Sequence, residues 1–289
     1  MQVLPGNASH IGLRLQQQDA YALSDFNDSE FVDHGGYLAV VADGIGGMLY
    51  GTDAANLAVA AFMDSYLSKP MLRDIDEAMD TALAAANRAV ITEAERRDCP
   101  EQMGTTLVAA VIYEHHVYWR SVGDSHLYLS REGRLSQLNA DHNFATTLQS
   151  WVSEGLISQN MADHHPERNT LESYLGLREL RLIDRNRSPL PLQNDDRLLL
   201  CSDGIDGTLS VAEITACLAE PPMRAAERLC FEVQAKQKPL QDNLTAVVMA
   251  YRPTQPRPRT NRLKFNMFIT LTTGLFFISV YFLIKTYLD

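Results

Sequence analysis

Two kinds of segment alternate irregularly along this chain, and their order limits the folds that it can adopt. Short apolar runs typical of strands cover 10–16, 20–24, 37–42, 105–113, 117–122, 126–130, 180–184, 197–201 and 244–251. Segments with the apolar spacing of helices cover 52–67, 74–94, 144–152, 155–161, 211–218 and 223–236. Helices fall between early strands, whereas hairpins fill the middle. This order predicts an α+β fold with helices packed on antiparallel sheets, rather than a regular βαβ array.

The composition is that of a folded globular protein. The chain has 289 residues, of which 46% are hydrophobic and 21% are charged, and this excludes a disordered or collagen-like polypeptide. Such a length corresponds to one or two domains. The four cysteines are scattered and form no CxxC pair, so we expect neither a disulfide framework nor a structural zinc site.

The charge is unevenly distributed along the chain. The net charge of the whole chain is −11, but residues 252–289 alone carry +5, so residues 1–251 carry −16. An acidic body of this kind repels the phosphate backbone of nucleic acids. We therefore expect no nucleic-acid partner.

The C-terminal segment predicts a membrane anchor. Residues 265–284 are a run of 20 residues without a charge, about the length that a helix needs to cross a bilayer. Residues 252–264 before it form a basic linker rich in proline and arginine, and 285–289 form a short tail. By the positive-inside rule, the linker would keep residues 1–251 in the cytoplasm. The alternative is an amphipathic or buried helix that docks on the body or on a partner.

Several aspartates stand at the ends of predicted strands, next to glycine or asparagine. They are Asp43, Asp124, Asp203 and Asp242, and Asp19 joins them just before the second predicted strand. Each alone is typical of a turn. Several carboxylates that converge on one place would repel one another unless a hard cation neutralised them, and oxygen ligands suit Mg²⁺ or Mn²⁺. The set therefore predicts a site for divalent cations.

Eight segments give the chain a resemblance to a known family. In the order of the sequence they are Arg14–Asp19, Val41–Gly47, Met103–Thr106, Gly123–Ser125, Asp141-His142, His165–Asn169, Cys201–Gly204 and Asp242–Thr245. They resemble the motifs of the type 2C (PPM-type) metal-dependent serine/threonine protein phosphatases, particularly bacterial members, over about residues 8–250. The resemblance implies that residues 1–251 form the phosphatase domain. It also implies a four-layer α/β/β/α sandwich of two antiparallel sheets flanked by helices.

The resemblance further implies a role for each matching acidic residue. Asp43 would bridge two divalent metal ions, Mn²⁺ or Mg²⁺, and the carbonyl of Gly44 would bind one of them. Asp203 and Asp242 would complete the ligands of the other ion. Asp19 would act nearby through a metal-bound water.

Two more residues gain a role in the same way. Asp124 would share a third, weakly bound ion with Asp203. Arg14 would bind the phosphate of the substrate, since a guanidinium matches two phosphate oxygens. The predicted catalytic residues are thus Arg14, Asp43, Asp203 and Asp242.

The sequence departs from the family pattern at five positions without losing a metal ligand. Ile45 and Met48 stand where relatives carry a histidine after Asp-Gly or after Gly-Gly. Gln17 and Gln18 replace the usual Asn and Glu, and His126 replaces a common arginine. The departures at Ile45 and Met48 leave no histidine in this motif to act as the proton donor.

These features predict an enzyme that hydrolyses phosphoserine and phosphothreonine with a water activated by two metal ions. It would be a single-pass protein, in a bacterial inner membrane by the resemblance, with its catalytic domain in the cytoplasm. Its partners would be a phosphorylated protein, linked to a serine/threonine kinase, and the lipid bilayer at 265–284. One alternative is a module of the same fold that binds phosphoproteins or kinases with little turnover. Another is a phosphatase that acts on a small phosphorylated metabolite.

Overall fold

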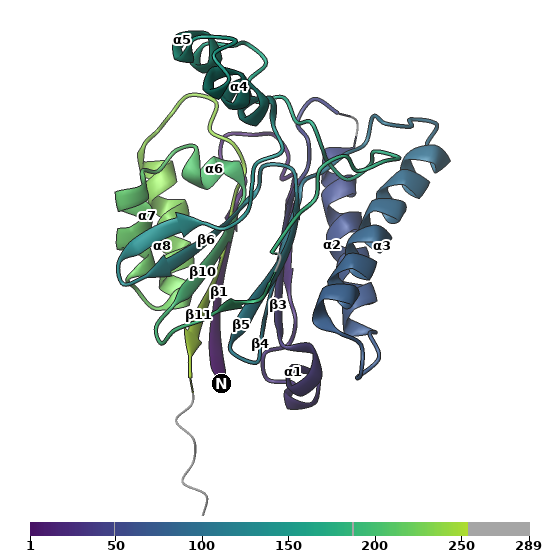
Figure 1. Cartoon of the computed structure of the whole chain (residues 1–289), viewed down its shortest axis with the longest axis vertical. Helices are drawn as coiled ribbons and strands as arrows, with labels where there is room; N and C mark the ends of the chain where they lie inside the picture. Colours follow the sequence, from purple (N-terminus) through teal and green to yellow (C-terminus); the bar gives the residue numbers. More distant parts are fainter. Residues whose placement is uncertain (49, 187, 254–289) are drawn as a thin grey trace, which may run out of the picture. The chain divides into compact units, whose positions relative to one another are not determined.

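The computed structural model describes residues 1–253 apart from 49 and 187, and Met1–Pro253 form one compact unit. Two antiparallel sheets lie face to face in this unit (Figure 1). The first contains β1 (Gln2–His10), β11 (Leu244–Arg252), β10 (Arg197–Cys201), β6 (His126–Arg131) and β7 (Arg134–Gln137), in that order. The second contains β2 (Asp19–Leu23), β3 (Tyr37–Asp43), β4 (Leu107–Tyr113), β5 (His116–Val122) and β8 (Asp184–Arg185), and β9 (Leu190–Pro191) also pairs with β5.

Helices cover the outer face of each sheet. The second sheet carries α2 (Gly51–Leu67) and α3 (Ile75–Arg96). The first sheet carries α6 (Asp203–Asp206), α7 (Val211–Leu218) and α8 (Pro222–Ala235). The remaining helices are α1 (Ser29–Gly35) at one end of the sandwich and α4 (Phe144–Ser153) and α5 (Gln159–Asp163) at the other (Figure 1).

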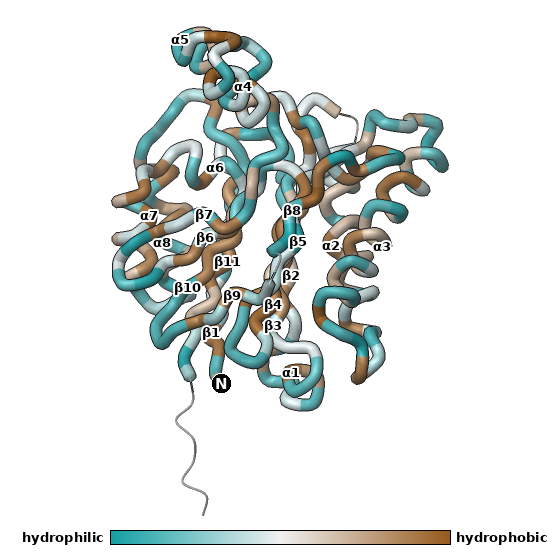
Figure 2. The backbone as a smooth tube through the Cα atoms, in the orientation of Figure 1, coloured by the Kyte–Doolittle hydropathy of each residue, from teal (hydrophilic) through white to brown (hydrophobic). Residues whose placement is uncertain are grey.

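Three apolar layers hold this arrangement together. Phe62 and Met79 belong to the layer between the second sheet and its helices, and Leu229 to the layer between the first sheet and α8. The middle layer lies between the two sheets and includes Val41 and Leu200. Because β3 is buried on both faces, its sequence is a continuous apolar run rather than an alternating one, and Figure 2 shows such hydrophobic strands inside the sandwich. The predicted sandwich of two antiparallel sheets flanked by helices is confirmed.

Some predicted elements are wrong or displaced. The first strand is Gln2–His10, whereas 11–16 form a loop. Ile11, Leu13 and Leu15 alternate as in a strand, but their exposed fractions are 38%, 66% and 99%, so the alternation does not reflect burial. The predicted strand at 180–184 is reduced to the two residues of β8, and the predicted helix at 155–161 begins only at Gln159. Helices α1 and α6 and strands β7 and β9 were not predicted from the sequence.

The predicted membrane anchor belongs to the part of the chain beyond Pro253. The linker beyond Pro253, the span 265–284 and the tail 285–289 lie outside the described residues. Among the residues that are described, no helix combines the length and the apolar character needed to cross a membrane.

Candidate active site

The pairing of the strands brings the predicted acidic residues to one end of the sandwich. Asp19 lies opposite Asp43 in the pairing of β2 with β3. In the other sheet, the end of β10 lies beside the starts of β6 and β11, because Cys201 pairs with both His126 and Ala246. Asp124, Asp203 and Asp242 flank these strand ends and therefore gather at the same place.

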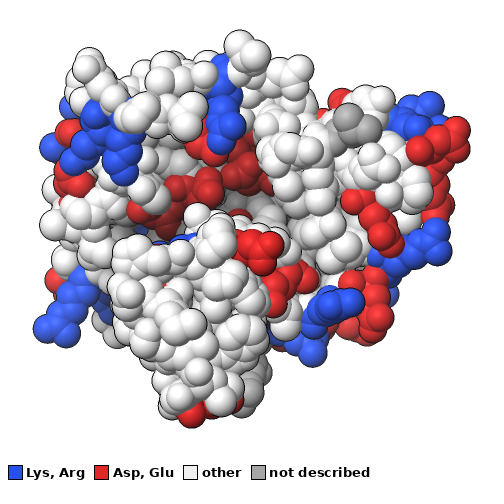
Figure 3. Space-filling view, turned by 90° about the horizontal axis from the view of Figure 1, so that it is seen from above, with Lys and Arg blue, Asp and Glu red and all other residues white. Residues whose placement is uncertain are grey.

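The gathered residues line a cavity of about 620 Å³. Figure 3 looks onto this end of the molecule and shows acidic side chains collected in a hollow. The lining residues are Arg14, Asp43, Ile45, Gly46, Met48, Thr106, Asp124, Asn169, Thr170, Leu171, Tyr174, Asp203 and Asp242. Five of the seven predicted site residues are among them; of the other two, Asp19 pairs with Asp43 and Gly44 follows Asp43 in the chain.

Backbone contacts fix the end of β3. The amide of Asp43 donates to the hydroxyl of Thr106 (2.9 Å), and the carbonyl of Asp43 accepts from the amide of Thr106 (2.9 Å). The amide of Gly44 donates to the carbonyl of Gln18 (3.0 Å). A Cβ at Gly44 would lie 2.3 Å from the carbonyl oxygen of Gly51, so only glycine allows this close approach of two backbones.

Asp19 is the most deeply placed of the predicted ligands. Its exposed fraction is 7%, and the hydroxyl of Ser202 donates to its Oδ2 (2.7 Å). Its other oxygen, Oδ1, is buried without a hydrogen-bond donor in the described structure. Burial raises the pKa of Asp19 to about 6, although the bond from Ser202 acts in the opposite direction.

The neighbouring carboxylates are also destabilised as anions. Burial and the charge of Asp19 raise the pKa of Asp43 well above its ordinary value. Burial and the charges of Asp124 and Asp242 raise the pKa of Asp203 to about 7, and burial raises the pKa of Asp124. These directions all arise from carboxylates crowded out of water, which is the setting that a bound cation relieves.

Arg14 and Asp242 face each other at the mouth of the cavity. Nε of Arg14 donates to Oδ1 of Asp242 (2.9 Å), and Nη2 donates to Oδ2 (2.7 Å). The two side chains are 48% and 40% exposed, so solvent weakens the pair. The predicted phosphate-binding residue and a predicted metal ligand are thus joined to each other in this structure.

The donor set suits a hard cation, but it is not assembled into a cage. In the described part of the chain, no group of three or more His, Cys, Asp or Glu side chains is arranged closely enough to hold a metal ion. Asp242 is engaged by Arg14. The orphaned oxygen of Asp19 and the raised pKa values of its neighbours nevertheless fit a group that supplies positive charge.

Sequence reasoning gave no role to three residues that build the site. Thr106 holds the end of β3, and Ser202 holds Asp19. Asn243 is buried, with an exposed fraction of 3%, and its side chain donates to the carbonyls of Ile11 (2.8 Å) and Gln16 (3.0 Å). It thereby fixes both ends of the loop that carries Arg14. All three lie inside the motif segments, but their partners are too distant in sequence to be inferred locally.

The fold and the cavity together define a class of protein: a sandwich of two sheets with a carboxylate-lined cavity, suited to cations, at one end of the strands. The chain belongs to the protein phosphatase 2C family, whose model matches residues 7–248. The family predicted from the eight motif segments is therefore confirmed.

Curated relatives carry the names of serine/threonine phosphatases. The chain is 30% identical over 215 residues to the serine/threonine phosphatase stp of Listeria innocua, a match that covers 73% of this chain and 83% of that protein. It is 31% identical over 249 residues to the serine/threonine protein phosphatase PstP of Mycobacterium tuberculosis, covering 84% of this chain and 47% of PstP. The predicted enzyme class, a serine/threonine phosphatase, agrees with these names and is confirmed.

Solved structures show the same fold. The crystal structure of PstP/Ppp from Mycobacterium tuberculosis matches with a TM-score of 0.71 and 28% identity, covering 88% of this chain and 100% of that one. PppA, described as a key regulatory component of the T6SS in Pseudomonas aeruginosa, matches with a TM-score of 0.69 and 27% identity, covering 87% and 99%. A structure of the PstP catalytic domain contains two manganese ions, and matches with a TM-score of 0.67 and 28% identity, covering 87% and 99%.

Proposed function

We propose that this chain is a metal-dependent phosphatase that removes phosphate from phosphoserine and phosphothreonine in proteins. The observation that carries the proposal is the convergence of Asp43, Asp124 and Asp203 with Arg14 in one cavity, in a chain of the protein phosphatase 2C family. The names of its relatives support this substrate class.

The acidic residues would hold two divalent cations, Mn²⁺ or Mg²⁺. The two manganese ions in the PstP structure support this number. Asp43, the carbonyl of Gly44, Asp203 and Asp242 would bind them, with Asp19 behind, and Asp124 and Asp203 would bind a weaker third ion. When bound, the ions lower the pKa of water and neutralise the charge of the phosphoryl oxygens. The role of Asp43 and Asp203 would be to hold their charge in place, Asp43 at the end of β3 and Asp203 at the start of α6.

Arg14 would orient the phosphate of the substrate. Its guanidinium is half exposed at the mouth of the cavity and presents two parallel donors to Asp242. Two oxygens of a phosphate can take the same donors. Substrate and cations would therefore replace the Arg14–Asp242 pair with separate partners for each member.

The lining supports direct attack by water over a phosphorylated serine, cysteine or histidine intermediate. Among the described residues that line the cavity there is no serine, cysteine or histidine, and the two hydroxyl amino acids other than Tyr174 are Thr106 and Thr170. Thr106 is committed to the backbone of β3 and to Ser125. An activated nucleophile needs a base within hydrogen-bond reach, and the histidine-free lining offers no imidazole base.

The test is phosphate release by the full-length chain from a phosphothreonine peptide and from p-nitrophenyl phosphate, with Mn²⁺, with Mg²⁺ and with chelator. We expect metal-dependent release, and Asp43→Asn and Asp203→Asn should lower it at least about 100-fold because each removes a charge that the cations require. Asp64→Asn, an exposed residue on α2, is the matched control and should keep full activity.

A folded protein without turnover on either substrate would contradict the proposal. If that protein bound the phosphopeptide, the result would favour the alternative of a phosphoprotein- or kinase-binding module. Release from p-nitrophenyl phosphate alone would favour a small phosphorylated metabolite as the substrate.

We further propose that residues 265–284 anchor the enzyme in a membrane, with residues 1–251 in the cytoplasm and a kinase-phosphorylated protein as client. The support is the uncharged run of 20 residues and the basic linker before it. Cell fractionation tests the proposal: the full chain should sediment with membranes and resist extraction at high salt. Recovery in the soluble fraction would contradict it.

A further inference from the structure

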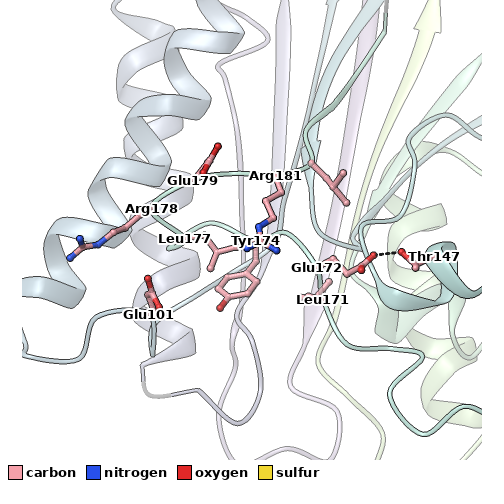
Figure 4. A pocket seen from close by; sticks show the side chains of 10 residues that line it. Glu101, Thr147, Leu171, Glu172, Tyr174, Leu177, Arg178, Glu179 and Arg181 are labelled. Atoms are coloured by element: carbon pink, nitrogen blue, oxygen red, sulfur yellow. Dashed lines mark hydrogen bonds between the residues drawn. The ribbon is translucent and has the colours of Figure 1, made fainter.

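A second cavity, of about 680 Å³, adjoins the acidic one. The two share Leu171 and Tyr174 in their linings, so they meet at these side chains. Figure 4 shows the second cavity with Tyr174 and Arg181 near its centre. Glu101 and Arg178 lie on one side of it, and Glu172 lies on the other. We call this cavity, lined by the ten residues of Figure 4, the flanking groove.

Tyr174 is a fixed partition between the cavity and the flanking groove. A Cβ at Gly104 would lie 2.7 Å from the ring of Tyr174, so the backbone of the loop before β4 is packed directly against the ring. Burial and the nearby charge of Glu101 raise the pKa of the Tyr174 hydroxyl. The groove therefore begins immediately beside the place proposed for the phosphate.

The charges in the flanking groove are unequal. Three carboxylates, those of Glu101, Glu172 and Glu179, face two guanidiniums, those of Arg178 and Arg181. The charged side chains that line the groove therefore carry a net charge of −1 when all are ionised.

The contacts of these side chains increase the imbalance. Arg178 lies 3.6 Å from Glu95, a carboxylate outside the lining, so part of its charge is directed away from the groove. Glu172 is held in place by the hydroxyl of Thr147, which donates to it (2.8 Å; Figure 4). The groove thus presents an excess of negative charge, part of it on a fixed side chain.

We propose that the flanking groove binds the polypeptide on one side of the phosphorylated residue and selects substrates with lysine or arginine there. The inference rests on the proposed function. A phosphoresidue in a protein carries neighbours that extend about 3.3 Å per residue, and a chain leaving the cavity past Tyr174 enters the groove at once. Its carboxylate excess attracts cationic side chains and repels acidic ones.

The charges of the groove predict opposite effects for two kinds of variant. Glu101→Gln with Glu172→Gln removes negative charge and should lower kcat/KM for a lysine-flanked phosphothreonine peptide by about tenfold, since each partly exposed pair contributes about two- to fivefold. Arg181→Gln should raise the same constant about twofold. Glu227→Gln, on α8, removes one negative charge outside the groove and should have no effect.

The experiment uses the full-length chain with Mn²⁺ and three phosphothreonine peptides, flanked by lysine, alanine or glutamate, and with p-nitrophenyl phosphate as a substrate too small to reach the groove. We expect the order lysine, alanine, glutamate, a preference that shrinks in the double variant and grows in Arg181→Gln. The constants for p-nitrophenyl phosphate should be unchanged in all variants.

Two results would overturn the inference alone while p-nitrophenyl phosphate is still hydrolysed. One is an equal or reversed order of the peptides. The other is a preference for lysine that the double variant retains in full. Failure to hydrolyse any of the four substrates would instead overturn the proposed function, and the inference with it.

Discussion

His126, at the start of β6, connects two segments beside the site: the loop that carries Asp141 and the helix α6. Its Nε2 lies 3.0 Å from Oδ1 of Asp141, and its Nδ1 lies 2.5 Å from Oδ2 of Asp206, which also accepts from the hydroxyl of Tyr128 (2.6 Å). Asp206 belongs to α6, the helix that begins with Asp203. Burial lowers the pKa of His126, but its contacts with the carboxylates of Asp141 and Asp206 outweigh burial and raise the pKa to about 10.

The raised pKa predicts a pH-dependent contribution of His126 to stability. A base whose pKa is higher in the folded state stabilises fully below its unfolded pKa of about 6.5, and the contribution is lost as the pH rises toward 10. We expect His126→Gln to lower the free energy of unfolding by about 3 kcal/mol at pH 6, as for a broken buried ion pair.

Thermal unfolding between pH 6 and pH 10 checks this contribution. The difference between the wild type and His126→Gln should be largest at pH 6 and should narrow steadily above pH 6.5. His164→Gln, an exposed residue after α5, serves as the control. A difference that does not vary with pH would mean that His126 acts by packing alone.

At the scale of elements, residues 11–18 form a loop rather than the predicted strand, and this loop builds part of the site. It carries Arg14, and the side chain of Asn243 spans it. In addition to its two donated bonds, Asn243 accepts from the amide of Gln18 (2.8 Å). One buried side chain thus replaces the ladder of hydrogen bonds that would have fixed a strand.

This arrangement predicts a functional effect of Asn243→Ala. The change leaves the carbonyl of Gln16 and the amide of Gln18 without partners and removes one of the two donors to the carbonyl of Ile11, so we expect a loss of about 2–4 kcal/mol in stability. Arg14 would lose its fixed position, and kcat/KM for a phosphopeptide should fall at least about tenfold.

Asn186→Ala is the matched control for that variant. Asn186 also makes three such bonds, to Val117, Ser188 and Trp119, in a loop beside β5 that does not line the cavity. It should lose stability but keep its specific activity at a temperature where it is folded. Equal losses of activity in the two variants would refute the role given to Asn243.

For the whole molecule, repulsion among the carboxylates of the site lowers the stability of the folded sandwich. Asp43 ends β3, Asp19 pairs with it from β2, and Asp203 begins α6 just after β10; β3 and β10 are almost wholly buried between packed layers. The layers prevent the carboxylates from moving apart. Rigidity at this end of the sandwich is therefore obtained at the expense of mutual repulsion, which is a common feature of functional sites.

The repulsion predicts how the metal-free protein responds to pH. The pKa values of Asp19 and Asp203 are raised to about 6 and about 7, so both favour the folded state while protonated. Their contribution to stability is full below the unfolded pKa of about 4 and is lost as the pH rises to 7. In chelator, the melting temperature should therefore be lower at pH 7.5 than at pH 5.

Added Mn²⁺ should restore stability at pH 7.5. A concentration of 100 times Kd contributes about 2.7 kcal/mol, which corresponds to a rise of about 5–10 °C in the melting temperature. Differential scanning calorimetry of the wild type and Asp203→Asn measures both effects. The variant should show a smaller loss with pH and a smaller gain with Mn²⁺, and an unchanged response in both would contradict the assignment.

The sequence by itself determined the fold class and the family, and it predicted the acidic residues of the site. Continuous apolar runs such as 37–42 indicate burial on both faces, and an aspartate followed by glycine marks where such a run ends. These are local properties of the chain, so they can be read without knowledge of the pairing. The ordered motif segments then predicted the family over about residues 8–250, and the family model matches residues 7–248.

Only the tertiary structure decided what those residues touch. Arg14 meets Asp242 across 228 positions, and Asp19 meets Ser202 across 183. The sequence predicted a strand at 10–16, but the first strand of the structure, β1, pairs with β11 over Gln2–His10 and leaves 11–16 as a loop. The flanking groove likewise forms where the segment 171–182 packs beside Glu101 and α4. Contacts of this range depend on how whole strands pair and layers pack, and a local pattern carries no information about them.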